Sequence, residues 1–155
     1  MDYHEYRAIR QMLRKIPKVL REIDAVKLQR KAVLDEIRLV EGSINPQGQV
    51  ISGMPHGSGI SMTTENEAMK LISLKERYTD RLAELTKRIN DLEIFMYRIN
   101  VAMSWVSTDQ RKILHMRYWL TASMTATAID MNMSERQCFR LERQALEIMG
   151  EHLCC

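Results

Sequence analysis

A run of mostly hydrophobic residues between positions 71 and 103 constrains the fold more than any other feature. Its residues follow one another at intervals of four and three positions in turn, and we call them the heptad seam: Leu71, Lys75, Tyr78, Leu82, Leu85, Ile89, Leu92, Met96, Ile99 and Met103. This spacing predicts one long α-helix whose apolar stripe must be buried against another helix. Thr64 and Glu67 form a T-x-x-E capping box, so we expect the helix to span about residues 64–103.

A second amphipathic segment lies nearer the start of the chain. Its apolar residues recur at helical spacing and continue with a change of phase: Ile9, Leu13, Ile16, Leu20, Ile23, Ile37 and Val40. We therefore predict a helix over about residues 2–41. Pro17 either kinks this helix or lies near the first turn of a second one, because proline lacks an N–H group.

Residues 42–63 hold most of the glycines and two of the prolines, which predicts a long connecting loop. Across this loop the first helix is long enough to lie antiparallel to the helix of the heptad seam. Self-association would bury the seam equally well, so a homo-oligomer is the alternative arrangement. Because only 6% of residues are aromatic and no strand pattern occurs, we predict an all-α fold. We expect a helical hairpin or coiled-coil arm over residues 1–103.

Several functional classes receive no support from the sequence. The chain shows neither the apolar core of a signal peptide nor an apolar run long enough to span a membrane, so we expect a cytoplasmic protein. The glycine-rich run 53–59 follows no strand and precedes no GK[ST] motif, so a phosphate-binding loop is not expected. His152, Cys154 and Cys155 lack a fourth ligand for a metal. We predict no catalytic site, no metal and no cofactor.

Shorter helices follow the heptad seam, in a module that we expect to span residues 104–153. Ser107 or Thr108 can cap a helix that runs to about Leu120, and residues 121–123 then form a turn. One face of a second short helix is apolar or small: Met124, Thr127, Ala128 and Met131. Asn132 follows where the chain must turn sharply, and asparagine tolerates the left-handed conformation.

Ser134 and Gln137 form a second capping box, which opens a last helix. The inward face of this helix is predicted to comprise Cys138, Leu141, Ala145, Leu146 and Met149. Two helices joined by a tight turn have the spacing of a helix-turn-helix motif, whose second helix enters the major groove of DNA in many proteins.

The segment 113–146, ILHMRYWLTASMTATAIDMNMSERQCFRLERQAL, resembles region 4 of bacterial sigma factors. Within that group it is most similar to the late transcriptional regulators of phages of Gram-positive bacteria, the RinA and ArpU type. The similarity extends over about residues 54–153, where MPHGSGIS and TTENEAMKL resemble the linker and second-helix start of those proteins. The chain departs from the family at Thr127, where a larger aliphatic residue is usual, and at Asn132, where glycine is usual.

The outward face of the last helix could read DNA bases. Arg136, Phe139, Arg140 and Arg143 share one sector, with Glu135 beside them at the N-terminal end. Arginine can bind guanine O6 and N7, glutamate can accept from the cytosine amino group, and phenylalanine can touch a thymine methyl. The resemblance places Glu135, Arg136 and Arg140 at base-contacting positions and favours a phosphate contact for Arg143. The capping residues Ser134 and Gln137 belong to the same candidate DNA-binding surface, and solvated charges are the alternative for each residue.

A basic stretch near the start of the chain is a second candidate surface. The net charge is only +3, but Lys and Arg strongly outnumber acidic residues between positions 7 and 31. Arg10, Arg14, Lys18 and Arg21 fall along one stripe, offset from the apolar stripe, and could contact DNA phosphates. An ordinary solvated helix face and a surface for RNA polymerase are the alternatives.

The resemblance implies a sequence-specific DNA-binding transcription regulator, an activator of phage or prophage late genes in a bacterial host cell. Its expected partners are double-stranded DNA and host RNA polymerase. The DNA-recognition subunit of a phage packaging terminase is the nearest alternative, because such subunits also combine a helix-turn-helix with coiled-coil parts. A coiled-coil scaffold that does not bind DNA is a third interpretation.

Overall fold

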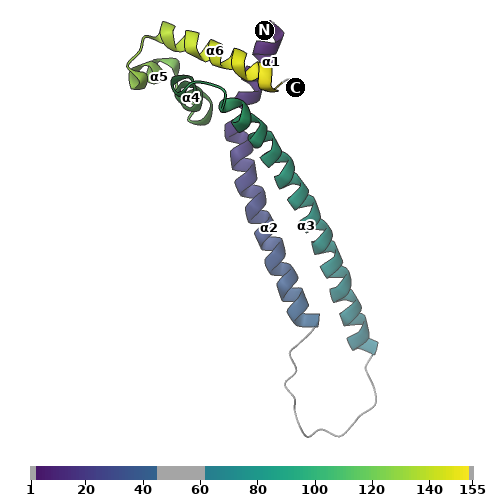
Figure 1. Ribbon diagram of the computed structural model, residues 1–155. Helices are drawn as coiled ribbons and strands as arrows, with labels where there is room; N and C mark the ends of the chain where they lie inside the picture. Colours follow the sequence, from purple (N-terminus) through teal and green to yellow (C-terminus); the bar gives the residue numbers. More distant parts are fainter. Residues whose placement is uncertain (1–2, 45–61, 154–155) are drawn as a thin grey trace. The chain divides into compact units, whose positions relative to one another are not determined.

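The computed structural model describes residues 3–44 and 62–153, and every element in these two ranges is helical (Figure 1). The elements are α1 (Tyr3–Arg14), α2 (Ile16–Ile44), α3 (Met62–Met103), α4 (Thr108–Leu114), the π-helical turn η1 (His115–Trp119), α5 (Met124–Met131) and α6 (Glu135–Leu153). The predicted all-α class is confirmed. Among these described helices, none has the length and the apolar character needed to cross a membrane.

The chain divides into two compact units. The head unit combines Met1–Asp24 with Asn90–Cys155, and the hairpin unit is Ala25–Ile89. This division differs from the predicted boundary between an arm over residues 1–103 and a module over 104–153. The reason is that α1 and the end of α3 share one hydrophobic core with α6, so both belong to the head unit.

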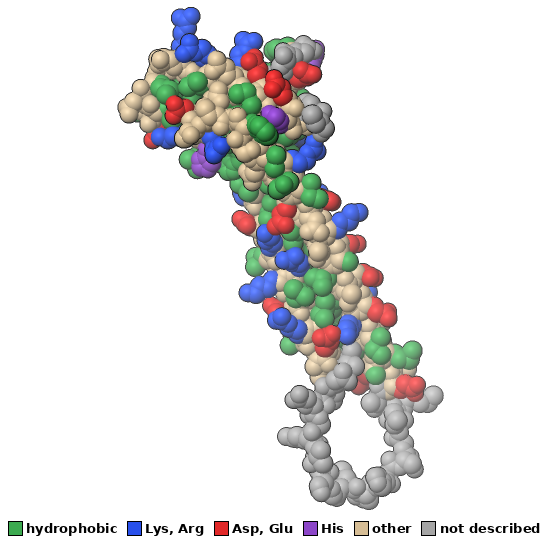
Figure 2. Space-filling model, in the orientation of Figure 1, with side chains coloured by type: hydrophobic (Ala, Val, Ile, Leu, Met, Phe, Trp, Pro, Cys, Tyr) green, Lys and Arg blue, Asp and Glu red, His purple; other side chains and the backbone are tan. Residues whose placement is uncertain are grey.

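In the hairpin unit, the second part of α2 runs antiparallel to the first part of α3. Val26 and Val33 of α2 pack with Leu85 and Ile89 of α3, while the side chains of Glu41 and Lys75 form an ion pair of 2.8 Å near the other end. On the face shown in Figure 2, Lys and Arg side chains are interspersed with Asp and Glu along this hairpin. Leu85 and Ile89 of the heptad seam are thus buried against α2 of the same chain, as the first of the two predicted arrangements requires.

The end of α2 and the start of α3 differ from the boundaries that the sequence predicts. Helix α2 continues to Ile44, although the loop was predicted from Gly42 onward. Val40 is buried and the Ser43 hydroxyl donates to the Leu39 carbonyl at 3.0 Å, so α2 keeps helical contacts on both sides of Gly42 despite the low helix propensity of glycine. Helix α3 begins at Met62 rather than Thr64. The side chain of Thr64 and the glycine-rich run 53–59 lie outside the described residues.

The helical segment at the start of the chain is broken at Lys15. Its amide donates to the Met12 carbonyl at 3.1 Å, and the Val19 amide donates to the Lys15 carbonyl at 2.9 Å. Pro17 therefore lies in the first turn of α2, where its missing N–H group costs no helical hydrogen bond. The second of the two interpretations of Pro17 is confirmed.

The core of the head unit combines residues far apart in the chain. Its buried members include Ile9 and Leu13 of α1, Ile16 and Ile23 of α2, Leu92, Met96, Ile99 and Met103 of α3, and Ala145, Leu146, Met149 and Leu153 of α6. Each large aliphatic side chain buried in this way contributes about 1.5–3 kcal/mol to folding. Helix α6 is thus held in place by α1 and α3.

Candidate nucleic-acid interface

Two serine caps position the helices that precede α6. Ser107 forms a capping box with Gln110, in which the Gln110 amide donates to Ser107 Oγ at 3.3 Å and the Ser107 amide donates to Gln110 Oε1 at 3.0 Å. Ser123 caps α5 by accepting from the Ala126 amide at 3.1 Å. Thr127, one of the departures from the sigma-like pattern, is fully buried, and its hydroxyl donates to the Ser123 carbonyl at 2.8 Å. The caps therefore fix where α4 and α5 begin.

A tight turn joins α5 to α6. Asn132 adopts the predicted left-handed conformation, with φ 51 and ψ 41, and the Met133 amide donates to the Ala128 carbonyl at 3.0 Å. The Gln137 amide donates to Ser134 Oγ at 3.3 Å, and the Ser134 amide donates to Gln137 Oε1 at 3.1 Å, so the predicted second capping box is confirmed. The main chain can therefore turn at this point without leaving the first amides of α6 unpaired.

Helix α6 has a buried inward face and an exposed outward face. Cys138, Ala145, Leu146 and Met149 are buried and Leu141 is partly buried, as predicted. All of the predicted DNA-binding side chains are exposed: Ser134, Glu135, Arg136, Gln137, Phe139, Arg140 and Arg143. The Phe139 side chain retains 49% exposure, which is unusual for an aromatic residue that serves only to pack.

The predicted residues of this outward face are not equally available to a ligand. Ser134 and Gln137 use their side-chain oxygens in the cap. Arg143 Nε lies 3.3 Å from Glu147 Oε1, but this exposed ion pair stabilises the helix little and its arginine can be recruited by another anion. Among the described residues, neither Arg136 nor Arg140 has an ion-pair partner, which leaves the N-terminal half of α6 as the face best suited to contact bases.

Sequence reasoning missed a buried polar cluster behind α6. Glu142 is only 1% exposed, and its Oε1 accepts a hydrogen bond of 2.9 Å from the Tyr118 hydroxyl. Arg117 Nε lies 3.6 Å from the same oxygen, within ion-pair distance but too far for a hydrogen bond. Glu142 lies four residues after Cys138 and three before Ala145, so its position on the inward stripe was visible in the sequence, but its partners were not.

Arg10 of α1 belongs to this cluster rather than to an exposed stripe. Burial lowers the pKa of Arg10, but the neighbouring Tyr118 and Glu142 outweigh burial, so the pKa is raised overall. Arg10 is only partly exposed, whereas Arg14, Lys18 and Arg21 are exposed as predicted. The expected four-residue stripe therefore reduces to three exposed cations, because Arg10 turns toward the buried Tyr118 and Glu142 pair.

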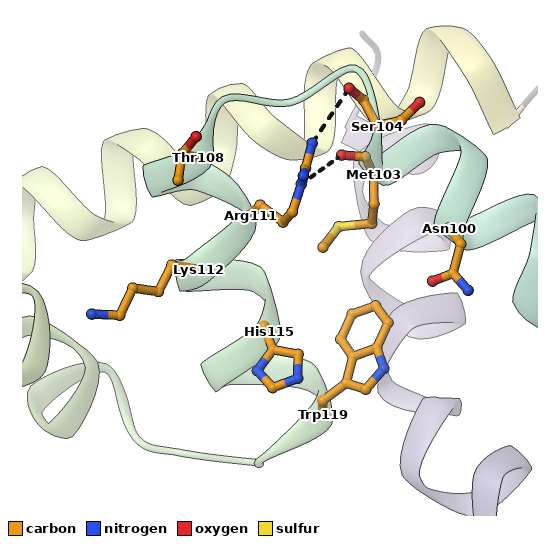
Figure 3. Close-up of a pocket in the computed structure, with 8 residues that line it drawn as sticks. All are labelled: Asn100, Met103, Ser104, Thr108, Arg111, Lys112, His115 and Trp119. Atoms are coloured by element: carbon orange, nitrogen blue, oxygen red, sulfur yellow. Dashed lines mark hydrogen bonds between the residues drawn. The ribbon is translucent and has the colours of Figure 1, made fainter.

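An apolar hollow of about 630 Å³ lies between the end of α3, helix α4 and η1 (Figure 3). Arg111 closes one side of it and donates from Nε to the Met103 carbonyl at 3.2 Å, which ties α4 to the end of α3. His115 and Trp119 stack with ring centroids 5.7 Å apart. Lys112, at the rim, forms a 3.0 Å ion pair with Asp130 of α5. These contacts hold α4 and η1 in position, and no predicted DNA-binding residue lines the hollow.

The described residues contain no group of three or more side chains suited to hold a metal ion. His152 stacks on Trp105 with centroids 4.5 Å apart, and Cys154 and Cys155 lie outside the described residues. Cys138 is buried, and burial first, then the charges of Glu135 and Glu142, raise the pKa of its thiol. A raised thiol pKa disfavours the reactive thiolate, which fits the predicted core position of Cys138.

Comparison with known proteins adds no relative to this picture: no family model matches the chain, and no curated protein or solved structure is significantly similar to it.

Proposed function

We propose that this protein is a sequence-specific DNA-binding transcription regulator that reads the major groove with the outward face of α6. The observation that carries the proposal is the arrangement of this helix. Its N-terminal half presents Glu135, Arg136, Phe139 and Arg140 to solvent, while its opposite face is buried in the head unit. A rigidly held helix with an exposed N-terminal half meets the requirement for insertion into the major groove.

The exposed side chains offer a specific chemistry for base recognition. Arg136 and Arg140 can each donate two hydrogen bonds to a guanine, and Glu135 can accept one from a cytosine amino group. Phe139 can cover a thymine methyl. Phosphate contacts would come from Arg143 and from the exposed cations of the N-terminal helices, Arg14, Lys18 and Arg21. Such contacts position the protein on the duplex but do not distinguish one base sequence from another.

The biological setting that we propose rests on the resemblance of residues 113–146 to sigma region 4 and to phage late regulators. In that setting the protein activates late genes of a phage or prophage in the cytoplasm of a bacterial host and touches host RNA polymerase. Double-stranded DNA is the proposed partner. Because the seam residues from Leu85 to Met103 are buried within one chain, DNA binding in this proposal does not require self-association.

Selection of genomic fragments tests the proposal. The purified protein is mixed with sheared DNA of the genome that encodes it, bound fragments are sequenced, and the selection is repeated with the Arg136→Ala, Arg140→Ala double variant. Enrichment of one promoter-proximal site by the wild type alone is the expected result. Enrichment at a packaging start, together with a ring-shaped oligomer, would support the terminase alternative instead. Absence of any enriched site would leave the scaffold interpretation.

A further inference from the structure

A small hollow of about 260 Å³ brings three arginines together in the head unit. Arg10 and Arg14 of α1 line one side, Arg117 of η1 lines another, and Thr121 and Ala122 of the following turn complete the wall with Pro17 and Tyr118. The arginines come from two segments more than a hundred residues apart in the chain. The folding of α1 against the C-terminal helices creates this site, which neither segment forms alone.

The charges around the hollow do not balance. Three arginines line the hollow and none of its lining residues carries a carboxylate, while Glu142, which contacts Arg117, is buried and already accepts from Tyr118. The tyrosine does not offset the imbalance, because burial and then the charge of Glu142 raise its pKa and keep it neutral at physiological pH. The site therefore carries an excess of positive charge in partly desolvated surroundings, where an anion is attracted more strongly than at an open surface.

Two buried guanidinium N–H groups at the hollow are also left without a hydrogen bond. Nε of Arg10 and Nε of Arg117 are shielded from solvent and form no hydrogen bond, although Arg117 Nε keeps its 3.6 Å ion-pair contact with Glu142 Oε1. Arg117 uses Nη1 to donate to the Ala122 carbonyl at 2.7 Å, which holds its guanidinium group against the 121–122 turn. Because buried N–H groups nearly always form hydrogen bonds in folded proteins, two guanidinium N–H groups without one at the same hollow indicate a missing acceptor.

We propose that this hollow binds a phosphate group. A phosphate offers several acceptor oxygens and a charge that matches the excess of the site, and arginine is well suited to bind it. The source of the phosphate rests on the proposed function: in a DNA-binding protein it is a backbone phosphate of the duplex. A free phosphorylated compound offers the same chemistry, and the experiment below separates these two sources.

The first measurement needs no DNA. Inorganic phosphate is titrated into the full chain, with ionic strength held constant by chloride, while the arginine Nε–Hε signals of Arg10 and Arg117 are followed by NMR. We expect saturable shifts of both signals. Arg14→Gln should weaken phosphate binding about tenfold, since one of three charged donors is lost. Lys15→Gln is the matched control, because Lys15 is the exposed neighbour of Arg14 and does not line the hollow.

The second measurement identifies the source. Affinity for a mixed-sequence DNA duplex is measured at several salt concentrations for the wild type, Arg14→Gln and Lys15→Gln. If the site holds a backbone phosphate, Arg14→Gln flattens the plot of log affinity against log salt by about 0.9, and Lys15→Gln does not. Saturable NMR shifts without this difference in slope would assign the site to a free phosphorylated compound.

Wild-type arginine signals that do not respond to phosphate would overturn the proposal, as would equal effects of Arg14→Gln and Lys15→Gln in both measurements. Neither readout depends on base sequence. Failure of the phosphate site is therefore distinguishable from failure of sequence-specific recognition by α6, which the genomic selection tests separately. Thermal unfolding of both variants, whose substituted residues are exposed, verifies that they remain folded.

Discussion

The Tyr118 hydroxyl donates a 2.9 Å hydrogen bond to Glu142 Oε1, and both side chains are buried. This bond joins η1 to the middle of α6, two residues after Arg140, the last of the exposed residues proposed to contact bases. A buried carboxylate with a neutral hydroxyl donor and a nearby arginine is costly to disrupt, because the charge cannot be solvated when a partner is removed. The bond therefore fixes α6 relative to η1.

Replacement of Tyr118 by Phe should lower the free energy of unfolding by about 1.5–3 kcal/mol, since it removes a hydrogen bond to a charged group. Urea denaturation followed by circular dichroism measures the loss. Tyr97→Phe is the matched control, because Tyr97 is 69% exposed and its hydroxyl is open to water. Equal destabilisation by the two substitutions would contradict the assigned role of the buried bond.

The same bond predicts a pH dependence. Burial, then the charge and hydrogen bond of Glu142, raise the pKa of Tyr118 above its ordinary value of 10.0. The folded protein then retains a proton that the unfolded chain releases, so the contribution of Tyr118 to stability is complete below about pH 10 and declines as pH rises further. The difference in unfolding free energy between the wild type and Tyr118→Phe should shrink above that pH. A constant difference across alkaline pH would refute this.

Truncation within the heptad seam should be costly. Leu85 and Leu92 are 5% and 7% exposed, so replacing either by Ala should lower the free energy of unfolding by about 2–5 kcal/mol. Leu39→Ala provides the same chemical change at a residue of α2 that is 67% exposed, and it should alter stability by no more than about 0.5 kcal/mol. Thermal or urea unfolding compares the three variants. Similar losses at Leu85 and Leu39 would show that the seam is not the buried face.

Loss of a proposed base contact should weaken specific binding. Arg136→Ala and Arg140→Ala should each cost about 1–3 kcal/mol at the selected site and relax base preference there, with little effect on non-specific DNA. Arg81→Ala removes an exposed arginine of the hairpin unit and should leave specific affinity unchanged. Fluorescence anisotropy with the selected site and a scrambled duplex gives both affinities. Wild-type discrimination in both α6 variants would exclude this helix as the reading element.

Thr121 should tolerate glycine unusually well. It has a φ of 54, a left-handed conformation that is strained for a β-branched residue. Because Thr121 is exposed, Thr121→Gly should relieve strain without loss of packing and raise the free energy of unfolding by up to about 1 kcal/mol. Asn132→Gly, at a similar φ of 51, should change stability less, since asparagine already tolerates this region. A clear destabilisation by Thr121→Gly would contradict the strain argument.

The parts of the fold that depend on local sequence were predictable. Asn132 marks the turn before α6 because few side chains accept its conformation, and the pairs Ser107–Gln110 and Ser134–Gln137 mark helix starts because short polar side chains satisfy free amides. The heptad seam predicted the long helix because burial enforces its period. The proposed DNA contacts of Arg136 and Arg140 stay predictions, since exposure allows contact without showing it.

The parts that depend on distant contacts were not predictable. Arg10 resembles its exposed neighbours Arg14 and Lys18 in sequence, and only the approach of Tyr118 and Glu142 distinguishes it. Gly42 has a low helix propensity, yet α2 continues through it to Ile44. A contact between residues a hundred positions apart produces no periodic pattern around either residue. A single sequence therefore predicts which face of a helix is buried, but not which other helix packs against it.

The head unit is discontinuous along the chain, because the hairpin unit separates its two parts. During synthesis on the ribosome, the apolar residues Ile9, Leu13 and Ile16 emerge well before the segments of α3 and α6 that cover them in the finished protein. The nascent chain must therefore carry an uncovered hydrophobic helix until translation has passed α6, an interval in which chaperones or wrong partners can reach it. A nascent chain that has exposed α2 and α3 but not yet α6 can close its hairpin unit while its head unit is still incomplete.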